Sequence, residues 1–237
     1  MNPFFGEFFG TAIILLLGGG VVANVSLDKT NGHNSGLIVI AFGWAIGVFS
    51  GVLFAAPISG AHLNPAITLA FVLAHKFSPA LVPLYITAQL TGAMFGSALV
   101  WLAYKKHFDA TLDSDAKLGV FCTSPRIRSY GYNFLTELIG THMLVMAVLY
   151  MAVPDVGLGA LNALPVALVV LGIGLSLGGP TGYAINPARD LGPRIMHYFL
   201  PIPGKRDSDW KYAWVPILGP LAGAVSAAVL FLILKSF

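Results

Sequence analysis

The sequence is poor in charge and in cysteine. Only 10% of its 237 residues are Asp, Glu, Lys or Arg, whereas a soluble domain of ordinary composition carries about 25%. Much of its surface is therefore expected to face lipid rather than water. The one cysteine, Cys122, excludes an intrachain disulfide and a multi-cysteine metal site.

Motifs of catalysis and of nucleic-acid binding are also missing. The six His residues show no HxxxH spacing, and no nucleophile elbow, phosphate loop or dinucleotide-binding turn is present. The net charge of +3 comes from basic residues scattered through loops, without a basic stripe. We therefore expect no enzymatic activity, no cofactor, no metal site and no nucleic-acid partner.

What the sequence has instead is long hydrophobic runs, which make up most of its 57% of hydrophobic residues. A helix needs about 20 mainly apolar residues to cross roughly 30 Å of hydrocarbon. The first run begins beside Glu7 and lacks a basic segment before it, so we interpret it as a span and not as a removable signal peptide. Six segments are long enough: about 4–25, 36–57, 80–104, 131–153, 160–179 and 212–235.

Two further apolar segments, 65–76 and 187–199, are too short to span. Each offers about 11 helical residues, or roughly 16 Å, which is half a membrane. The sequence therefore predicts an all-α membrane protein with six transmembrane helices and two re-entrant half-helices.

The chain also repeats itself. A Glu-x-x-Gly-Thr pattern begins at Glu7 and again at Glu137, and each copy is followed by two spans, an Asn-Pro-Ala turn, a half-helix and a third span. Three spans separate the two turns, an odd number, so the repeats are inverted. We interpret 1–237 as a single channel domain, with one inverted repeat at 1–104, a connecting loop at 105–130 and the other repeat at 131–237.

The two turns, taken together, are the most informative feature of the sequence. Asn is a good N-cap and Pro suits the first helical position, so both half-helix N-termini are expected to meet at the midplane. Their partial positive charges would exclude cations, including protons. The asparagine NH2 groups would point into the lumen. An ordinary helix cap explains one turn alone, but not two in inverted halves. The turns are Asn64-Pro65-Ala66 and Asn186-Pro187-Ala188.

The segments before the turns, 57–63 and 179–185, are expected to be extended. Such backbone is tolerated at membrane depth only where it lines a cavity or is buried. Glu7 and Glu137 are expected to accept hydrogen bonds from its amides, although Glu7 could instead begin a helix at the membrane interface. The carbonyls expected to line the pore belong to Gly60, Ala61, His62, Gly182, Tyr183 and Ala184.

Arg189 is the third residue of the second half-helix. An arginine at membrane depth is costly and usually functional. Its guanidinium is expected to repel cations and to bind hydroxyls or water at a constriction. The alternative is an arginine that reaches up to the membrane interface. Asp190, which follows, is expected to complement the helix N-terminus.

With these residues in place, the chain resembles the aquaporin family, and within it the glycerol facilitators. Residues 59–66 and 182–190 are similar to the two family signatures, and the resemblance covers essentially the whole chain. It implies a homotetramer in the cell membrane, with one pore per subunit and both termini in the cytoplasm. The distribution of Lys and Arg in the loops favours the opposite orientation, but the paired signatures are more specific. Asp190, Arg194 and Pro216-Ile217 resemble the glycerol-conducting group.

The resemblance also implies a narrow filter at Trp44, Gly174, Tyr183 and Arg189. Water-selective members resemble one another in having His at the place of Gly174, so its absence is expected to open room. Trp44 and Tyr183 would then form an apolar corner opposite Arg189. Tyr183 stands where many glycerol facilitators carry Phe, which leaves the relative rates for different solutes open.

We therefore predict a passive channel for glycerol and other small neutral solutes together with water, which excludes ions and protons. Urea, hydrogen peroxide and undissociated small acids are further expected solutes. A water-selective channel and a coupled secondary transporter are the alternatives, followed by a non-conducting scaffold protein.

Overall fold

The computed structural model describes residues 2–151 and 159–236. Over these residues every regular element is a helix, and six helices are long and apolar enough to cross a membrane, so the predicted fold class is confirmed. The predicted spans agree with the helices within a few residues, except that residues 152 and 153 lie outside the described part. The six are α1 (Pro3–Ser26), α2 (Leu37–Ser59), α4 (Val82–Ala103), α7 (Tyr130–Tyr150), α8 (Leu164–Thr181) and α10 (Val215–Lys235).

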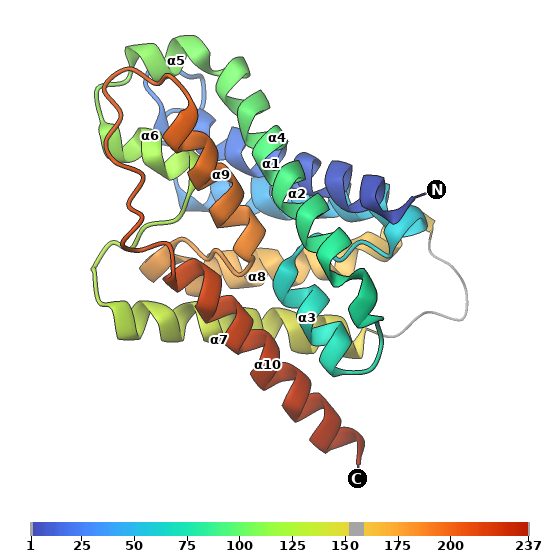
Figure 1. Cartoon of the computed structure of the whole chain (residues 1–237). Coiled ribbons are helices and arrows are strands. Elements are labelled where there is room, and N and C mark those ends of the chain that lie inside the picture. The colour runs from blue at the N-terminus through green and yellow to red at the C-terminus, as the bar shows by residue number, and fades with distance from the viewer. Residues whose placement is uncertain (1, 152–158, 237) are drawn as a thin grey trace.

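Two half-length helices, α3 (Pro65–Leu73) and α9 (Pro187–Phe199), begin in the middle of the bundle and run toward opposite ends (Figure 1). Each packs against the third long helix of the other half, α3 on α10 and α9 on α4. This exchange joins the two halves into one bundle. Short 3-10 helices, η1 (Pro79–Leu81) and η2 (Gly159–Ala163), precede α4 and α8.

The segment 105–130, predicted to be a loop, contains two short helices, α5 (Lys105–Ala110) and α6 (Ser114–Phe121). The Asp113 carboxylate caps α6 by accepting from the amides of Asp115 and Ala116. Leu118 and Phe121 of α6 are buried, where the helix packs on α1 and α9. The sequence prediction looked for apolar runs long enough to span a membrane, and these two helices are too short and too polar to meet that criterion.

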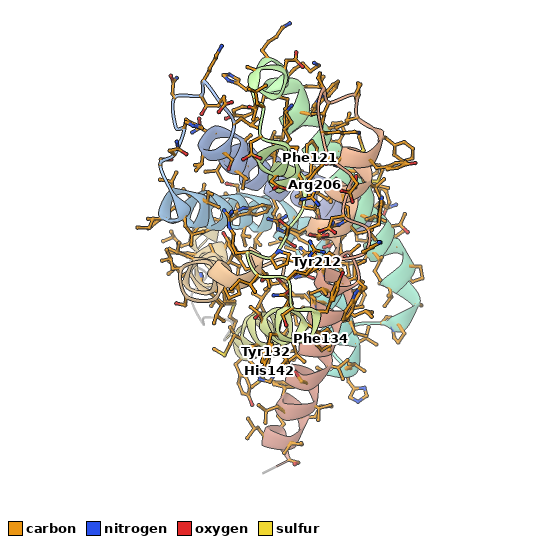
Figure 2. The ribbon with its side chains drawn as sticks, turned by 90° about the vertical axis from the view of Figure 1, so that its left-hand side faces the viewer. Phe121, Tyr132, Phe134, His142, Arg206 and Tyr212 are labelled. Carbon is orange, nitrogen blue, oxygen red and sulfur yellow. The ribbon has the colours of Figure 1, made fainter. Side chains whose placement is uncertain are left out.

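Both chain ends lie at one end of the bundle, which we call the terminal face, and α5 and α6 lie at the other, the loop face (Figure 1). Figure 2 views the loop face, with Tyr132 and Phe134 on α7. Trp214 stacks on Phe134, with ring centroids 6.0 Å apart. Aromatic side chains at a bundle end are typical of the membrane interface.

Close crossings of the long helices depend on glycine. A Cβ atom at Gly92 of α4 would lie 2.2 Å from the carbonyl oxygen of Phe8 in α1. The equivalent crossing of α10 over α7 places a Cβ at Gly223 only 2.4 Å from the oxygen of Leu138. Because both obstacles are backbone atoms, they cannot move aside, and glycine permits these contacts.

Gly92→Ala is therefore expected to lower the free energy of unfolding by about 1–3 kcal/mol, the usual cost of overpacking. Gly20→Ala is the matched control, because a Cβ at Gly20 would meet nothing within 4 Å. Thermal unfolding in detergent micelles measures both variants. Equal melting temperatures for the two would contradict the close crossing of α1 and α4.

Candidate transport pore

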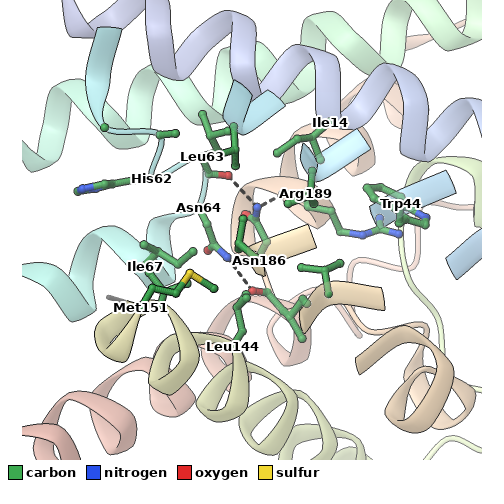
Figure 3. Close-up of a pocket in the computed structure, with 18 of the residues that line it drawn as sticks. Ile14, Trp44, His62, Leu63, Asn64, Ile67, Leu144, Met151, Asn186 and Arg189 are labelled. Carbon is green, nitrogen blue, oxygen red and sulfur yellow. Dashed lines mark hydrogen bonds between the residues drawn. The ribbon is translucent and has the colours of Figure 1, made fainter. Parts of the chain in front are cut away.

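A cavity of about 190 Å³ runs along the junction of the two halves (Figure 3). Trp44 and Arg189 lie among the residues lining it, as do both asparagines of the Asn-Pro-Ala turns. Much of the remaining wall is apolar, and nothing in the sequence distinguished these side chains from those that face lipid or the core. They are Ile14, Val48, Val52, Ile67, Phe71, Leu144, Val148, Met151, Val166 and Val170.

The two asparagines cap the half-helices as predicted. Asn64 Oδ1 accepts from the amide of Ala66 at 2.9 Å. Asn186 Oδ1 accepts from the amides of Ala188 and Arg189 at 3.0 and 3.2 Å. A proline follows each cap at the first helical position. Both helix N-termini, with their partial positive charges, thus meet at one level of the cavity.

The NH2 groups of these asparagines are not wholly free, which corrects the expectation. Asn64 Nδ2 donates to the Ile185 carbonyl oxygen, and Asn186 Nδ2 donates to that of Leu63, both at 2.8 Å (Figure 3). Each NH2 carries two hydrogens, so one remains for a molecule in the lumen. The reciprocal bonds tie the two halves together at the centre of the pore.

The predicted extended segments are shorter than expected. Helices α2 and α8 continue through Pro57 and Pro180 to Ser59 and Thr181, and each is capped by the next residue, Gly60 or Gly182, with φ of 82° and 84°. The left-handed conformation of a glycine is what terminates a helix in this way. The prediction of extended backbone was therefore wrong for 57–59 and 179–181, because each proline lies within the last turn of its helix.

Within the remaining segments, 60–63 and 182–185, alternate residues also depart from extended geometry. Ala61 and Leu63 have φ of 54° and 52°, and Tyr183 and Ile185 have φ of 40° and 43°. Left-handed φ costs a non-glycine residue of order 1–3 kcal/mol, so other contacts must hold it. Positive φ at alternate residues turns consecutive N–H groups to the same side of the chain.

Two buried carboxylates bind these N–H groups. Glu7 accepts from the amides of His62 and Leu63 at 2.9 and 2.7 Å. Glu137 accepts from the amides of Ala184 and Ile185 at 3.0 and 2.9 Å. Glu7 therefore lies inside the bundle and does not begin a helix at the interface.

Side-chain donors complete both carboxylate sites, and sequence reasoning missed them. Glu7 also accepts from the Ser59 hydroxyl and from Gln89 Nε2, and Glu137 accepts from the Thr181 hydroxyl, each at 2.7 Å. Ser59 and Thr181 occupy matching places at the ends of α2 and α8. That symmetry was the signal in the sequence that could have found them.

Arg189 is buried at the end of the cavity near Trp44. Its Cζ atom lies 4.0 Å from the centroid of the Trp44 ring, so the planar cation rests on the aromatic face. Within the described residues its Nη1 has no hydrogen-bond partner. The arginine does not reach up to the membrane interface, and it retains donor capacity for a solute.

Residues 1–231 match the family model described as major intrinsic protein. The chain belongs to this family. It is 54% identical over 231 residues to the "Probable glycerol uptake facilitator protein" of Thermotoga maritima, covering 98% of each chain. It is 48% identical to the "Glycerol uptake facilitator protein" of Streptococcus pneumoniae strain R6, again covering 98% of each. The X-ray structure of the aquaglyceroporin from Plasmodium falciparum superposes with a TM-score of 0.86 at 33% identity, covering 96% of this chain and 93% of that one.

As a major intrinsic protein of the aquaglyceroporin subgroup, the chain is a multi-pass membrane protein. Gly174 does not open the lumen as expected. A Cβ atom there would lie 3.0 Å from Tyr183 Cζ and 3.2 Å from Ala41 Cβ, so the tyrosine ring fills the space. Among the predicted lining residues, Gly60, Ala61, His62, Tyr183 and Ala184 line the cavity.

Gly182 does not line this cavity. It ends α8, and a Cβ atom there would lie 3.5 Å from Thr123 Cγ2. Asp190 also lies away from the lumen, fully buried. Its carboxylate accepts from Arg194 Nε at 2.8 Å and from the amide and hydroxyl of Thr123, both at 2.7 Å. It therefore joins α9 to the segment after α6.

Proposed function

We propose that this chain is a passive channel for glycerol and other small neutral solutes, with water as a co-permeant, which excludes ions and protons. The observation that carries the proposal is Arg189 resting on Trp44 beside Tyr183, at the end of a largely apolar cavity. Two relatives named as glycerol uptake facilitators, which match nearly the whole chain, support the same solute.

A polyol has a carbon side and a hydroxyl side, and the pore offers a surface for each. The apolar wall and the rings of Trp44 and Tyr183 accommodate carbon atoms. Arg189 donates to hydroxyl oxygens, and the carbonyls of the re-entrant segments, such as Ala61 and Ala184, accept from hydroxyl hydrogens. Trp44, Gly174, Tyr183 and Arg189 are proposed as the filter, in which Gly174 acts by seating the tyrosine ring.

Ion exclusion is assigned to two barriers. The N-termini of α3 and α9 converge where Asn64 and Asn186 meet, and a cation there would face two positive helix ends in a medium of low dielectric constant. The Arg189 guanidinium adds a full positive charge nearer the loop face. A water molecule that accepts from the remaining asparagine hydrogens is turned so that a chain of proton transfers is interrupted.

The proposal is tested by stopped-flow light scattering on proteoliposomes that contain the purified chain. We expect glycerol and water fluxes above those of empty liposomes. These fluxes should not saturate with solute concentration and should not depend on an ion gradient. Water flux without glycerol flux would overturn the proposal in favour of a water-selective channel. Uptake that depends on an ion gradient would favour a coupled transporter. The same assay with urea, hydrogen peroxide and undissociated small acids defines the range of solutes.

Replacing Gly174 by alanine is expected to lower glycerol permeability about tenfold. The new methyl group would displace the Tyr183 ring toward the lumen, at an overpacking cost of about 1–3 kcal/mol for glycerol passage. Gly172→Ala is the matched control, because a Cβ at Gly172 in the same helix meets nothing within 4 Å. Unchanged glycerol flux in the Gly174 variant would show that the ring does not bound the filter.

The assembly and orientation are proposed from family membership. We propose that the chain forms a homotetramer with a pore in each subunit, and that both termini lie in the cytoplasm. The domain is read as two inverted repeats, 1–104 and 131–237, joined by 105–130. Reporter fusions at the C-terminus and within 105–130 test the orientation, and cross-linking in native membranes tests the tetramer. A cytoplasmic reporter in 105–130 would reverse the assignment.

A further inference from the structure

The segment 123–128, which follows α6, is bound at both of its ends across the loop face. We call it the strap. At its first residue, Thr123, the amide and the hydroxyl donate to Asp190, and the carbonyl accepts from Arg194 Nη2 at 3.0 Å. Every polar group of Thr123 is therefore held by the half-helix that carries Arg189.

The strap also touches the end of α8. The Arg126 amide donates to the Pro180 carbonyl at 3.2 Å, and a Cβ atom at Gly182 would lie 3.5 Å from Thr123 Cγ2. Gly182 immediately precedes Tyr183. The strap therefore binds Asp190, the chain neighbour of Arg189, and lies beside Gly182, the chain neighbour of Tyr183.

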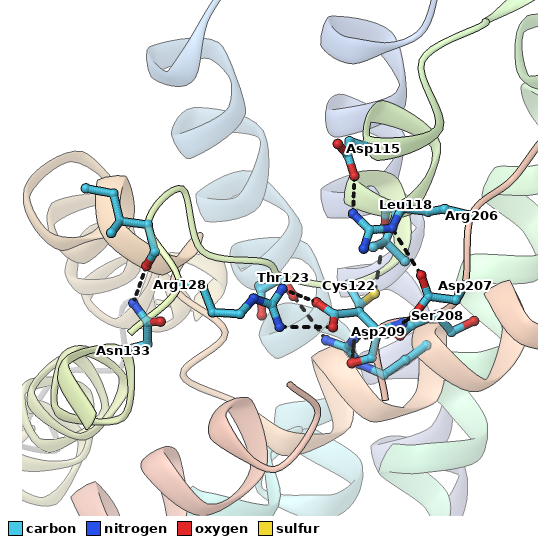
Figure 4. Close-up of polar contacts among 12 residues, drawn as sticks. Asp115, Leu118, Cys122, Thr123, Arg128, Asn133, Arg206, Asp207, Ser208 and Asp209 are labelled. Carbon is cyan, nitrogen blue, oxygen red and sulfur yellow. Dashed lines mark hydrogen bonds and ion pairs between the residues drawn. The ribbon is translucent and has the colours of Figure 1, made fainter. Parts of the chain in front are cut away.

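The other end of the strap is bound by an ion pair. Arg128 donates from both terminal nitrogens to the Asp209 carboxylate, at 3.0 and 2.5 Å (Figure 4). These hydrogen bonds raise the pKa of Arg128 above its ordinary value. Arg194 Nη1 in turn donates to the carbonyls of Ser208 and Asp209 at 2.7 and 3.1 Å. The contacts form a closed ring from α9 through the strap to the 208–209 backbone and back to α9.

The two fastenings differ in exposure. The Asp190 and Arg194 side chains are fully buried, so removing either would leave an unpaired buried charge and endanger folding. The Arg128 side chain is 37% exposed, whereas its partner Asp209 is only 7% exposed. Water can therefore solvate Arg128 when the charge of Asp209 is removed. The Arg128–Asp209 pair is the part of the ring that can be opened while the fold persists.

We propose that Arg128 and Asp209 are positioning residues for the filter, which hold the strap against the chain neighbours of Arg189 and Tyr183 and thereby set the preference for glycerol over water. This inference rests on the proposed function. Glycerol must place its carbons on the rings and its hydroxyls on Arg189 at the same time, which demands a rigid filter. Water needs one or two hydrogen bonds at a time and tolerates a looser one.

The test is Asp209→Asn, which removes the ion pair but suits the backbone, because Asn accepts the left-handed φ of 49° at this position. Stopped-flow measurements on proteoliposomes give the glycerol-to-water permeability ratio. We expect this ratio to fall about fivefold, the upper range for a partly exposed pair, through loss of glycerol flux and with an unchanged melting temperature. Arg128→Gln should lower the ratio too, but it leaves the buried Asp209 carboxylate, whose side chain is 7% exposed, without its partner, so its melting temperature should also fall. Combining Asp209→Asn with Arg128→Gln should restore the melting temperature and leave the ratio at the value of Asp209→Asn alone.

Asp115→Asn is the matched control. It breaks the Arg206–Asp115 ion pair at the same face (Figure 4). Among the described residues, neither side chain of this pair makes a hydrogen bond or ion pair with the strap. Its permeability ratio is expected to equal that of the unaltered chain. An unchanged ratio in Asp209→Asn, or glycerol and water fluxes that fall together with the melting temperature, would overturn the inference. Absence of glycerol flux in the unaltered chain would instead overturn the proposed function.

Discussion

Replacing Glu137 by glutamine is expected to reduce glycerol flux tenfold or more, mainly by destabilising the second re-entrant segment. The Glu137 carboxyl oxygens accept from two backbone amides and from the Thr181 hydroxyl. A glutamine keeps one accepting oxygen and sets an NH2 group against a donor in place of the other. A buried donor without a partner costs about 1–3 kcal/mol.

The strained backbone adds to that cost. Tyr183 and Ile185 hold left-handed φ angles, each worth of order 1–3 kcal/mol, and the carboxylate is what holds their segment. Total stabilities are only about 5–15 kcal/mol, so the loss is a large fraction. Melting temperature in detergent and flux per folded channel separate loss of fold from loss of conduction. Asp113→Asn is the control, because asparagine caps a helix as aspartate does. A melting temperature and a glycerol flux equal to those of the unaltered chain in Glu137→Gln would show that residues 182–185 keep their conformation without the carboxylate.

Replacing Arg189 by valine is expected to let cations leak through the pore, with proton flux rising between tenfold and a hundredfold. A fixed charge about 5 Å from a permeating cation repels it by about 3 kcal/mol at an effective dielectric constant of ~20. Valine removes that charge and leaves the helix ends at Asn64 and Asn186 as the remaining barrier. A pH-sensitive dye inside proteoliposomes, under a potassium diffusion potential, measures the leak.

Arg189→Lys is the companion variant. Lysine keeps the positive charge but loses the flat stacking on Trp44. Its proton flux should remain at the level of the unaltered chain, while its glycerol flux should fall because the paired donors are lost. A proton-tight Arg189→Val channel would assign ion exclusion to the half-helix ends alone.

Much of the architecture could be predicted because it depends on the lengths of apolar runs and on the number of spans. The length of an apolar run decides whether a helix spans the bilayer, and an odd number of spans between two similar turns makes the halves inverted. The caps at Asn64 and Asn186 were predictable for a similar reason, since capping is local chemistry. The helices and caps of the structure agree with these expectations.

Local rules failed where distant segments meet. Pro57 and Pro180 suggested an early end to α2 and α8, yet glycines three and two residues later end these helices. Gly174 suggested open space, yet the Tyr183 ring occupies it. The asparagine NH2 groups were expected to be free, yet each donates to a carbonyl of the opposite half. The helix ends are set by a nearby glycine, but the partners of Gly174 and of the two asparagines lie farther along the chain, where local rules do not reach.

The sequence by itself determined the membrane class, the six spans, the two half-helices and the pairing of their N-termini, because hydrophobic length and capping depend only on nearby residues. Only the tertiary structure decided which apolar side chains line the cavity, which donors complete the sites of Glu7 and Glu137, and how Arg128 and Asp209 fasten the strap. Each of these features joins side chains that are far apart in the sequence. The same residue types occur at many other positions in the bundle, so the sequence does not indicate which of them meet.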